Sequence, residues 1–360
     1  MTGKSYFIYS EDYLKYQFGP THPFQPVRGK MALDLLMKKG AFRDKARVVE
    51  PEPATVDDLL LAHSREYVEF VRRQTALGHG FLDFGDTPAT KGLFEASCTV
   101  VGGSIMGAKQ VFDGECTHAF NVGGGLHHAT SNAASGFCVF NDIAVAVKWL
   151  QKNRGAKRIA VIDIDGHHGD GTQSIFYDEP ILKISFQRIG IFPQTGYVDE
   201  IGEGEGEGYS VNIPLGGSTG DERFLYAYRE VVPPLLRWYK PEIVFFVCGI
   251  DGHQGDPLAD LSLTSRTYVS VAESLHELTH ELCQGKLLLL GGGGYLLDVT
   301  ARCWALIFAV VSQTVSPSEY ADLLDKEVAE THQNMSRIKD TVEEVRQTIF
   351  KMHNLLQAKY

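Results

Sequence analysis

Two segments of the chain place carboxylates and an imidazole just after an apolar run. Asp163, Asp165 and His167 alternate at the end of RIAVIDI, and Asp251 follows IVFFVCG, with Asp256 five residues further on. Because side chains alternate faces along a strand, the first three are expected to point the same way. Carboxylates buried together need a cation or a network of hydrogen-bond donors. Two carboxylates and one imidazole with an open position fit a catalytic zinc site, and these oxygen and nitrogen ligands would also accept iron(II).

A second pair of imidazoles follows a run of glycines. His127 and His128 come after the segment GGGL, which itself follows the apolar run THAFNV. Two adjacent imidazoles cannot both remain protonated cheaply, so their neighbours would split their protonation. General acid–base catalysis needs such a group near neutral pH with a carboxylate behind it, and Asp163 and Asp170 are available for that role. Alone, however, adjacent histidines are more often inert loop residues.

A third segment could supply an electrophilic helper. Four glycines at 291–294 end the apolar run KLLLL and lead into Tyr295. Glycines let the backbone pass close to a pocket, and the tyrosine hydroxyl can face a developing oxyanion. A glycine turn followed by an aromatic residue is common, so the motif gains weight only from its position next to the others.

The elements that must position these groups alternate between two kinds of pattern. Apolar, β-branched runs predict strands, and longer segments of helical period lie between them. This alternation predicts a parallel sheet covered by helices on both faces. In such sheets ligands bind beyond the carboxyl ends of the strands, so the glycine-rich clusters are expected to meet at one edge. The predicted strands are 117–122, 158–164, 181–186, 243–249 and 286–290, and the predicted helices are 27–39, 91–112, 141–152, 222–238 and 264–283.

Composition narrows the class of protein. The chain has 360 residues, 44% of them hydrophobic, and a net charge of −11, which argues against a nucleic-acid partner. No apolar stretch reaches the roughly eighteen residues of a membrane span, and the first residues carry no signal pattern, so we expect a cytoplasmic protein. The six cysteines are scattered and are expected to be reduced. No linker divides residues 1–360, which predicts a single catalytic domain. A helical extension at about 318–356 is expected to pack on that domain, with oligomerisation through it as the alternative.

With these residues in view, the sequence resembles the zinc-dependent histone deacetylase superfamily, in particular its bacterial acetoin-utilisation-protein-like branch. The resemblance runs from about His22 to Trp304 and implies a three-layer α/β fold of the arginase/deacetylase type. Its central, mainly parallel sheet would have about eight strands flanked by helices. The motifs that carry the resemblance, in chain order, are HPFQPVRG (22–29), GDTPAT (85–90), GGGLHHA (123–129), SGFCVFNDIA (135–144), DIDGHHGDGT (163–172), GIDGHQGDP (249–257) and GGGGY (291–295).

The resemblance also implies roles for single residues. It makes Asp165, His167 and Asp251 the zinc ligands, and Tyr295 the group that polarises the scissile carbonyl. His128 is then the proton shuttle and His127 a mainly electrostatic partner, backed by Asp170 and Asp163 respectively. The remaining implied positions are channel walls at Gly136, Phe137 and Phe192, a rim carboxylate at Asp86, an arginine near the acetate exit at Arg28, and a potassium ion held by Ser185 and by backbone carbonyls around Asp163, Asp165 and His167.

Two departures from the family pattern concern the rim. The stretch 185–192 is about two residues shorter than usual before the PxTG turn, and Gln187 stands where histidine is common. Leu258 stands where polyamine deacetylases of this family carry a glutamate, which argues against a polyamine preference.

The sequence therefore predicts a zinc-dependent amidohydrolase, and the family resemblance implies that it also binds K⁺. It would remove acetyl or related acyl groups from lysine side chains of proteins or from small lysine-like amines. Deacetylation of polyamines or other small amides is an alternative. A binuclear, arginase-like hydrolase is another and would need His128 and Asp170 as further metal ligands. A non-catalytic acyl-lysine binder is the third, although such proteins usually lose one of the site residues.

Overall fold

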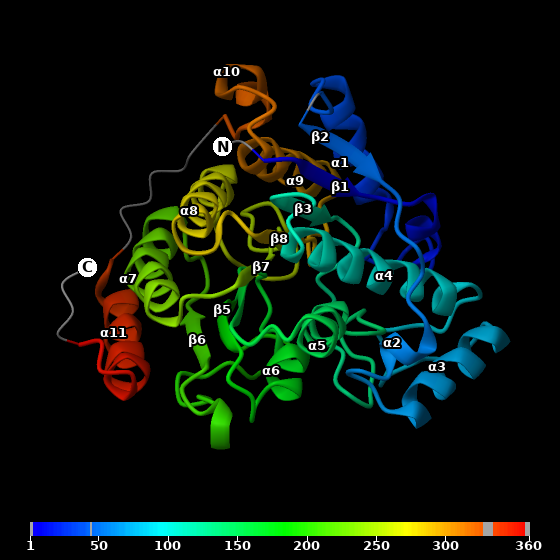
Figure 1. Ribbon diagram of the computed structural model, residues 1–360, viewed down its shortest axis with the longest axis horizontal. Coiled ribbons are helices and arrows are strands. Elements are labelled where there is room, and N and C mark those ends of the chain that lie inside the picture. The colour runs from blue at the N-terminus through cyan, green and yellow to red at the C-terminus, as the bar shows by residue number, and fades with distance from the viewer. Residues whose placement is uncertain (1–2, 44, 327–333, 357–360) are drawn as a thin grey trace.

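The centre of the molecule is one eight-stranded sheet, seen in a computed structural model that describes residues 3–43, 45–326 and 334–356 (Figure 1). The strand order is β2-β1-β3-β8-β7-β4-β5-β6, and every adjacent pair is parallel. The strands are β1 (Ser5–Ile8), β2 (Ala46–Val49), β3 (His118–Asn121), β4 (Ile159–Asp163), β5 (Leu182–Arg188), β6 (Ser210–Leu215), β7 (Ile243–Val247) and β8 (Leu287–Leu290).

Helices cover both faces of this sheet. On one face α1 packs on α9, α9 on α8 and α8 on α7; on the other, α4 packs on β3 and α5, and α5 on α6 (Figure 1). Because both faces are covered, β4, β7 and β8 are buried along their whole length and carry unbroken apolar runs. The longer helices are α1 (Val27–Lys38), α3 (Arg65–Leu77), α4 (Leu93–Phe112), α5 (Asp142–Arg154), α7 (Asp221–Tyr239), α8 (Ser265–Cys283) and α9 (Leu297–Ser312).

Several short helical turns are also present. They are α2 (Val56–Leu59), α6 (Asp170–Ile175), α10 (Pro317–Tyr320) and the 3-10 turns Glu11–Lys15, Gly204–Gly206 and Ala321–Leu323. In the described residues, no helix combines the length and the apolar run that crossing a membrane requires.

The fold confirms the predicted three-layer α/β arrangement. All five predicted strands and all five predicted helices are present, with ends shifted by at most two residues. The strands β1, β2 and β6 and the helices α3 and α9 were not predicted. β1 and β2 have four residues each, and β2 at the sheet edge is half exposed, so neither produces a long apolar run.

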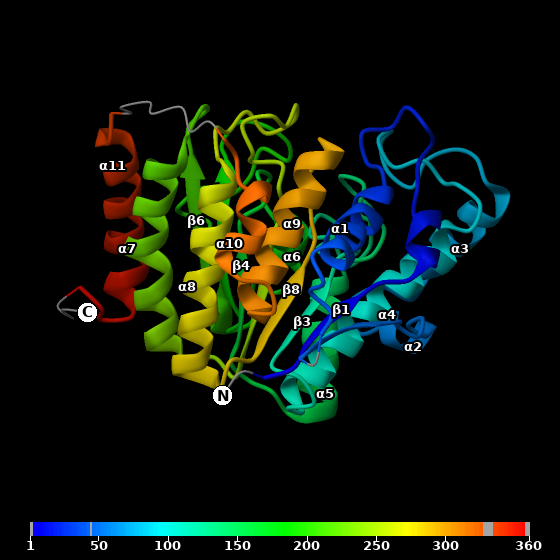
Figure 2. The same ribbon diagram turned by 90° about the horizontal axis from the view of Figure 1, so that it is seen from above.

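The C-terminal segment differs from the single long helix suggested for 318–356. It contains α10, a 3-10 turn, then α11 (Ser336–Val345) and a π-helical turn (Arg346–Phe350); residues 327–333 lie outside the described chain. α11 lies beside α7 at the β6 edge of the sheet (Figure 2) and buries Ile338, Val342 and Val345. The expected packing of an apolar stripe on the body therefore holds for α11.

Candidate active site

Four neighbouring strands bring the four glycine-rich motifs to one edge of the sheet. In the order β3-β8-β7-β4, these strands are followed by the motifs at 123–128, 291–295, 249–257 and 163–170. All run parallel, so their carboxyl ends share one edge. The predicted convergence of the four motifs at one edge of the sheet is therefore confirmed.

The candidate metal ligands meet at the centre of that edge. One ligand atom from each of Asp165, His167 and Asp251 lies within 4.8 Å of the others, and all three side chains are buried. Nδ1 of His167 lies 2.6 Å from Oδ2 of Asp251 and 3.5 Å from Oδ1 of Asp165. The backbone N–H groups of Gly293 and Gly166 donate to Asp165 Oδ2 (2.6 Å) and Asp251 Oδ1 (2.7 Å).

Loop hydrogen bonds, and not strand alternation, aim these ligands. β4 ends at Asp163, so Asp165 and His167 already lie beyond the sheet. The N–H of Asp165 donates to Asp163 Oδ1, and the N–H of His167 donates to Asp165 Oδ1, both at 3.0 Å. Asp256, the further carboxylate of the second segment, instead accepts from the N–H groups of Tyr295 (2.6 Å) and Leu258 (3.0 Å), and so holds two loops together.

Two glycines are required beside the ligands for steric reasons. A Cβ on Gly249 would overlap Oδ2 of Asp165, and a Cβ on Gly293 would lie 2.7 Å from Cγ of Asp251. Neither residue has a positive φ angle, so the constraint is space next to the carboxylates and not backbone conformation.

The electrostatics of the three ligands favour a positive charge between them. Burial alone would lower the pKa of His167, but hydrogen bonds and charge from Asp165 and Asp251 outweigh it and raise that pKa to about 10. Burial and the neighbouring charge of Asp165 raise the pKa of Asp251 to about 7. The donor set, one imidazole and two carboxylates, therefore suits a divalent cation such as Zn²⁺ or Fe²⁺.

The tandem histidines stand beside this cluster, each with its own carboxylate. Nδ1 of His127 lies 2.7 Å from Asp163 Oδ2, and Nδ1 of His128 lies 2.7 Å from Asp170 Oδ1. The carboxylates can only accept, so both Nδ1 atoms carry protons, and the two Nε2 atoms contact each other at 3.1 Å. Burial lowers the pKa of His127, but Asp163 and Asp165 outweigh it and raise it to about 9. Burial and the charge of His127 lower the pKa of His128 to about 4.

Two residues that were not singled out from the sequence hold the histidine loop. Asp142, fully buried at the start of α5, accepts from the N–H groups of Gly125 (3.1 Å) and Leu126 (2.7 Å). Asn141, the N-cap of α5, donates to the carbonyl oxygens of His127 (3.4 Å) and Ala129 (3.0 Å). In the sequence these two residues appear only as an Asn-Asp pair at the start of a predicted helix. Helix capping alone explains such a pair, so the sequence did not indicate their role in the site.

Tyr295 and the tandem histidines line one small cavity of about 20 Å³. Its other lining residues include Asp165, Gly136 and Phe137. Among the described residues, no hydrogen-bond partner is found for the Tyr295 hydroxyl, so it is available to a ligand in the cavity. Behind it lies Arg28, 5% exposed, which donates to the carbonyl of Gly294 at 2.7 Å and stacks over the Phe24 ring at 4.4 Å.

The predicted channel residues lie around the same cavity. The Phe137 ring is 5.9 Å from that of Tyr295, and the Phe192 ring is 4.9 Å from His128. A Cβ on Gly136 would approach the Phe192 ring to 2.8 Å, so the shortened stretch at 185–192 still brings this aromatic to the site. Tyr16, not predicted, fixes the Phe137 segment by donating to the carbonyl of Phe137 at 2.7 Å.

The rim positions are held by local contacts. Asp86 lies in a turn whose N–H groups bond to Asp83, and its backbone carbonyl contacts His22 at 3.0 Å. Burial and the neighbouring Asp83 raise the pKa of Asp86 to about 7. Leu258 is 37% exposed and follows the Asp256 turn that contacts Tyr295.

Ser185 lies behind the tandem histidines. It is the β5 partner of Asp163, and its buried hydroxyl oxygen has no hydrogen-bond partner in the described part of the chain. The next histidine, His168, points elsewhere: its ring nitrogens contact Thr195 (2.8 Å) and Gln173 (3.2 Å), which leaves it a structural role.

Comparison with known proteins agrees with this geometry. The family model "Histone deacetylase domain" matches residues 22–311. The "Acetoin utilization protein AcuC" of Bacillus subtilis is 41% identical over 315 residues, covering 84% of this chain and 81% of that protein. A "Probable deacetylase" of Archaeoglobus fulgidus is 39% identical over 294 residues, covering 81% of each.

A solved structure extends the likeness to three dimensions. The "Crystal Structure of HDA15 HD domain" superposes with a TM-score of 0.85 at 29% identity and covers 98% of this chain and 96% of that one. The expected arginase/deacetylase fold is thereby confirmed. The chain belongs to the histone deacetylase family, in the branch of the acetoin utilization proteins, and its class of chemistry is that of a deacetylase.

Proposed function

We propose that the chain is a zinc-dependent hydrolase that removes acetyl or related short acyl groups from lysine side chains or from small lysine-like amines. One observation carries the proposal. Asp165 and the tandem histidines line a single cavity with Tyr295, and Asp165 also belongs to the cluster with His167 and Asp251. Metal ligands, proton carriers and an oxyanion donor are thus within reach of one scissile amide.

The metal would supply Lewis-acid polarisation of the carbonyl and a water of lowered pKa. The chain itself supplies two histidines in different charge states. His128 is neutral at neutral pH and can accept a proton at Nε2, while His127 retains a proton at that pH. Asp170 and Asp163 hold the Nδ1 atoms, so both Nε2 atoms point away from these two carboxylates and toward each other. This asymmetry suits His128 as general base and a protonated histidine as proton source for the leaving amine.

Tyr295 is assigned to the developing oxyanion. Tyr295 lines the cavity, and burial together with the charges of Asp251 and Asp165 raises its pKa well above the usual value, so it stays a hydrogen-bond donor. Arg28 lies directly behind Tyr295, with its guanidinium 5.9 Å from the Tyr295 ring. A buried cation at that place suits a carboxylate product, which supports an acetate-exit role.

A potassium ion is the second proposed cofactor. The unpartnered, buried oxygen of Ser185 supports it, since a hydroxyl in that state is costly without a ligand. Backbone carbonyls around Asp163, Asp165 and His167 would complete the oxygen set. A monovalent-salt dependence of activity that distinguishes K⁺ from Na⁺ tests this assignment.

The wall residues favour a slender substrate. Phe137, Phe192 and Gly136 surround the way in, and adding even one methyl at Gly136 would collide with His128 or Phe192. An aliphatic lysine stem fits such walls. Leu258 is apolar and offers no negative charge to a polycationic amine, so deacetylation of polyamines is less favoured.

The binuclear reading lacks support in the geometry. His128 and Asp170 would have to hold a second metal. Among the described residues, they belong to neither group of three metal-binding side chains.

An activity panel tests the proposal. Acetyl-lysine and longer acyl-lysine peptides, and acetylated polyamines, would be assayed before and after treatment with a chelator. We expect turnover of an acyl-lysine peptide that chelation abolishes and Zn²⁺ restores. Turnover of none of these amides by the zinc-loaded protein would refute the function.

A further inference from the structure

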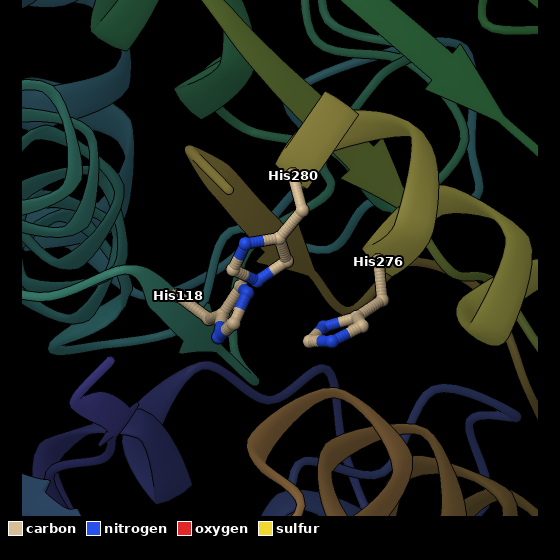
Figure 3. A group of neighbouring side chains, drawn as sticks. All are labelled: His118, His276 and His280. Atoms are coloured by element: carbon tan, nitrogen blue, oxygen red, sulfur yellow. The ribbon is translucent and has the colours of Figure 1, made fainter. Parts of the chain in front are cut away.

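Three histidines that take no part in the deacetylase site meet at the opposite edge of the sheet. His118 is the first residue of β3, and His276 and His280 lie one helical turn apart on α8 (Figure 3). One ring nitrogen from each lies within 4.8 Å of the others. The ring centroids are 4.6 to 5.5 Å apart. The tandem histidines follow β3, whereas this group stands at its start.

His118 is buried without full hydrogen bonding. It is 3% exposed, and its Nδ1 lies 3.2 Å from the hydroxyl oxygen of Ser5. In the described part of the chain its Nε2 has no hydrogen-bond partner, and the same holds for Nδ1 of His276. A buried polar atom in this state is costly unless something binds it. Two such atoms in one cluster point to a shared ligand.

The cluster is neutral at physiological pH. Burial, and then the neighbouring imidazoles, lower the pKa of His118 well below its usual value. Burial and the neighbouring His280 lower the pKa of His276 to about 4, and burial lowers that of His280. Unprotonated imidazoles offer the lone pairs that metals bind. At His276 the Nε2 atom lies 3.1 Å from the amide nitrogen of Gln313, so offering Nδ1 to an ion requires that amide to turn and accept from Nε2–H.

The cluster is reachable from outside. It borders a cavity of about 230 Å³ together with Gly3, Ser312 and Gln313. A second cavity, of about 680 Å³, shares His276 and His280 and is also lined by Glu273 and Glu277. An ion can therefore enter, and water or a carboxylate can take a fourth position.

We propose that His118, His276 and His280 form a second metal site, for a divalent transition-metal ion such as Zn²⁺ or Ni²⁺. Imidazole nitrogens suit these ions, and ligand nitrogens around tetrahedral zinc lie about 3.3 Å apart, which small side-chain rotations would reach from the present spacing. Ser5 would accept from Nδ1–H of His118, which fixes the tautomer that offers Nε2 to the ion. The bound ion would tie β3 to α8.

Metal counting on the full chain tests the site. The protein is stripped with a chelator, loaded with Zn²⁺, desalted and measured by elemental analysis. We expect two ions per chain in the parent, one in His276→Ala/His280→Ala and one in Asp165→Ala, which lacks a catalytic ligand. His79→Ala, which removes an exposed histidine outside the cluster, should keep two. His276 and His280 are partly exposed helix residues, so alanine at both is compatible with folding.

The outcomes separate the two sites. If His276→Ala/His280→Ala binds as many ions as the parent, the second site is refuted, whatever Asp165→Ala does. If Asp165→Ala binds as many ions as the parent while His276→Ala/His280→Ala binds one fewer, the catalytic assignment is wrong and the second site stands. As an independent readout, added Zn²⁺ should raise the melting temperature of Asp165→Ala, and this increase should vanish when His276→Ala/His280→Ala is combined with it. Deacetylase activity of His276→Ala/His280→Ala should stay within about threefold of the parent.

Discussion

The hydroxyl of Tyr295 offers a sharp test of the proposed mechanism, through the substitution Tyr295→Phe. Among the described residues the hydroxyl has no hydrogen-bond partner, and Tyr295 lines the same cavity as Asp165 and the tandem histidines. Its removal therefore leaves no protein group unsatisfied, and stability should change by less than about 0.5 kcal/mol. The ring, which packs near Phe137 and Arg28, is retained.

The catalytic effect should be far larger than the effect on stability. Loss of one preorganised donor to an oxyanion costs about 2.7–4 kcal/mol in the activation barrier, or roughly 100- to 1000-fold in kcat. Steady-state hydrolysis of an acetyl-lysine peptide by the zinc-loaded protein measures this, with kcat reduced and the metal content unchanged. The melting temperature of the same preparation checks that the fold is intact.

A second tyrosine provides the matched control. The hydroxyl of Tyr239 donates to the carbonyl oxygens of Pro180 (2.8 Å) and Ile159 (3.2 Å), and Ile159 begins β4, at the edge away from the site. Tyr239→Phe should lose roughly 1–3 kcal/mol of stability and keep its activity. If Tyr295→Phe instead kept kcat within about threefold of the parent, the oxyanion role would be wrong.

Three further predictions concern the metal site and the stability of the fold. Gly249→Ala should push Asp165 aside and lower the affinity for zinc at least tenfold, measured by competition with a chromophoric chelator. Gly216→Ala is the control: its new methyl group meets only the end of the flexible Arg337 side chain, so the affinity should not change. Chelation should abolish activity and Zn²⁺ restore it; activity that survives in the fully stripped protein would contradict metal dependence. Burial would raise the pKa of Asp325, but hydrogen bonds from His253, the N–H of Ser265 and Arg302 hold it below its usual value of 3.8. The ionised Asp325 therefore stabilises the fold above pH 3.8, and this contribution is lost as the pH falls below that value. In denaturant titrations, Asp325→Asn should lower the free energy of unfolding by roughly 1–2 kcal/mol at pH 7 and by progressively less at lower pH. An equal loss at all pH values would exclude an ionic origin.

The proposed second site changes how metal content must be interpreted. Two ions per chain would, taken alone, indicate a binuclear hydrolase. With the histidines of β3 and α8 included, the same count is expected of a mononuclear deacetylase that carries one further ion at the opposite edge. In the variant His276→Ala/His280→Ala the proposed second site is removed, so the ion count again reports on the catalytic site alone. One ion per chain then supports the deacetylase, and two support the binuclear enzyme.

The sequence alone determined the chemistry and the approximate elements. Apolar runs such as RIAVIDI and IVFFVCG predict buried parallel strands, because only strands covered on both faces remain apolar throughout. Each such run ends in glycines with a carboxylate, imidazole or phenol, which locates the site at the carboxyl edge. These are local patterns of a few residues, so one sequence suffices to find them.

Only the tertiary structure decided which groups act together. Sequence chemistry could not tell ligand from orienting carboxylate at Asp163 and Asp165; the structure turns Asp163 toward His127 and leaves Asp165 with His167 and Asp251. The reason is physical: strand order is a long-range property, and β8 lies between β3 and β7 although it comes last in the chain.

The same holds for the second histidine cluster. The spacing of His276 and His280 indicates one helix face, but the burial of His118 beneath that face follows from α8 packing over the sheet and from the position of β3 within it. Residues 118 and 276 are far apart in the chain, and no local pattern relates them. Their meeting, like that of the deacetylase groups, exists only once the sheet has formed.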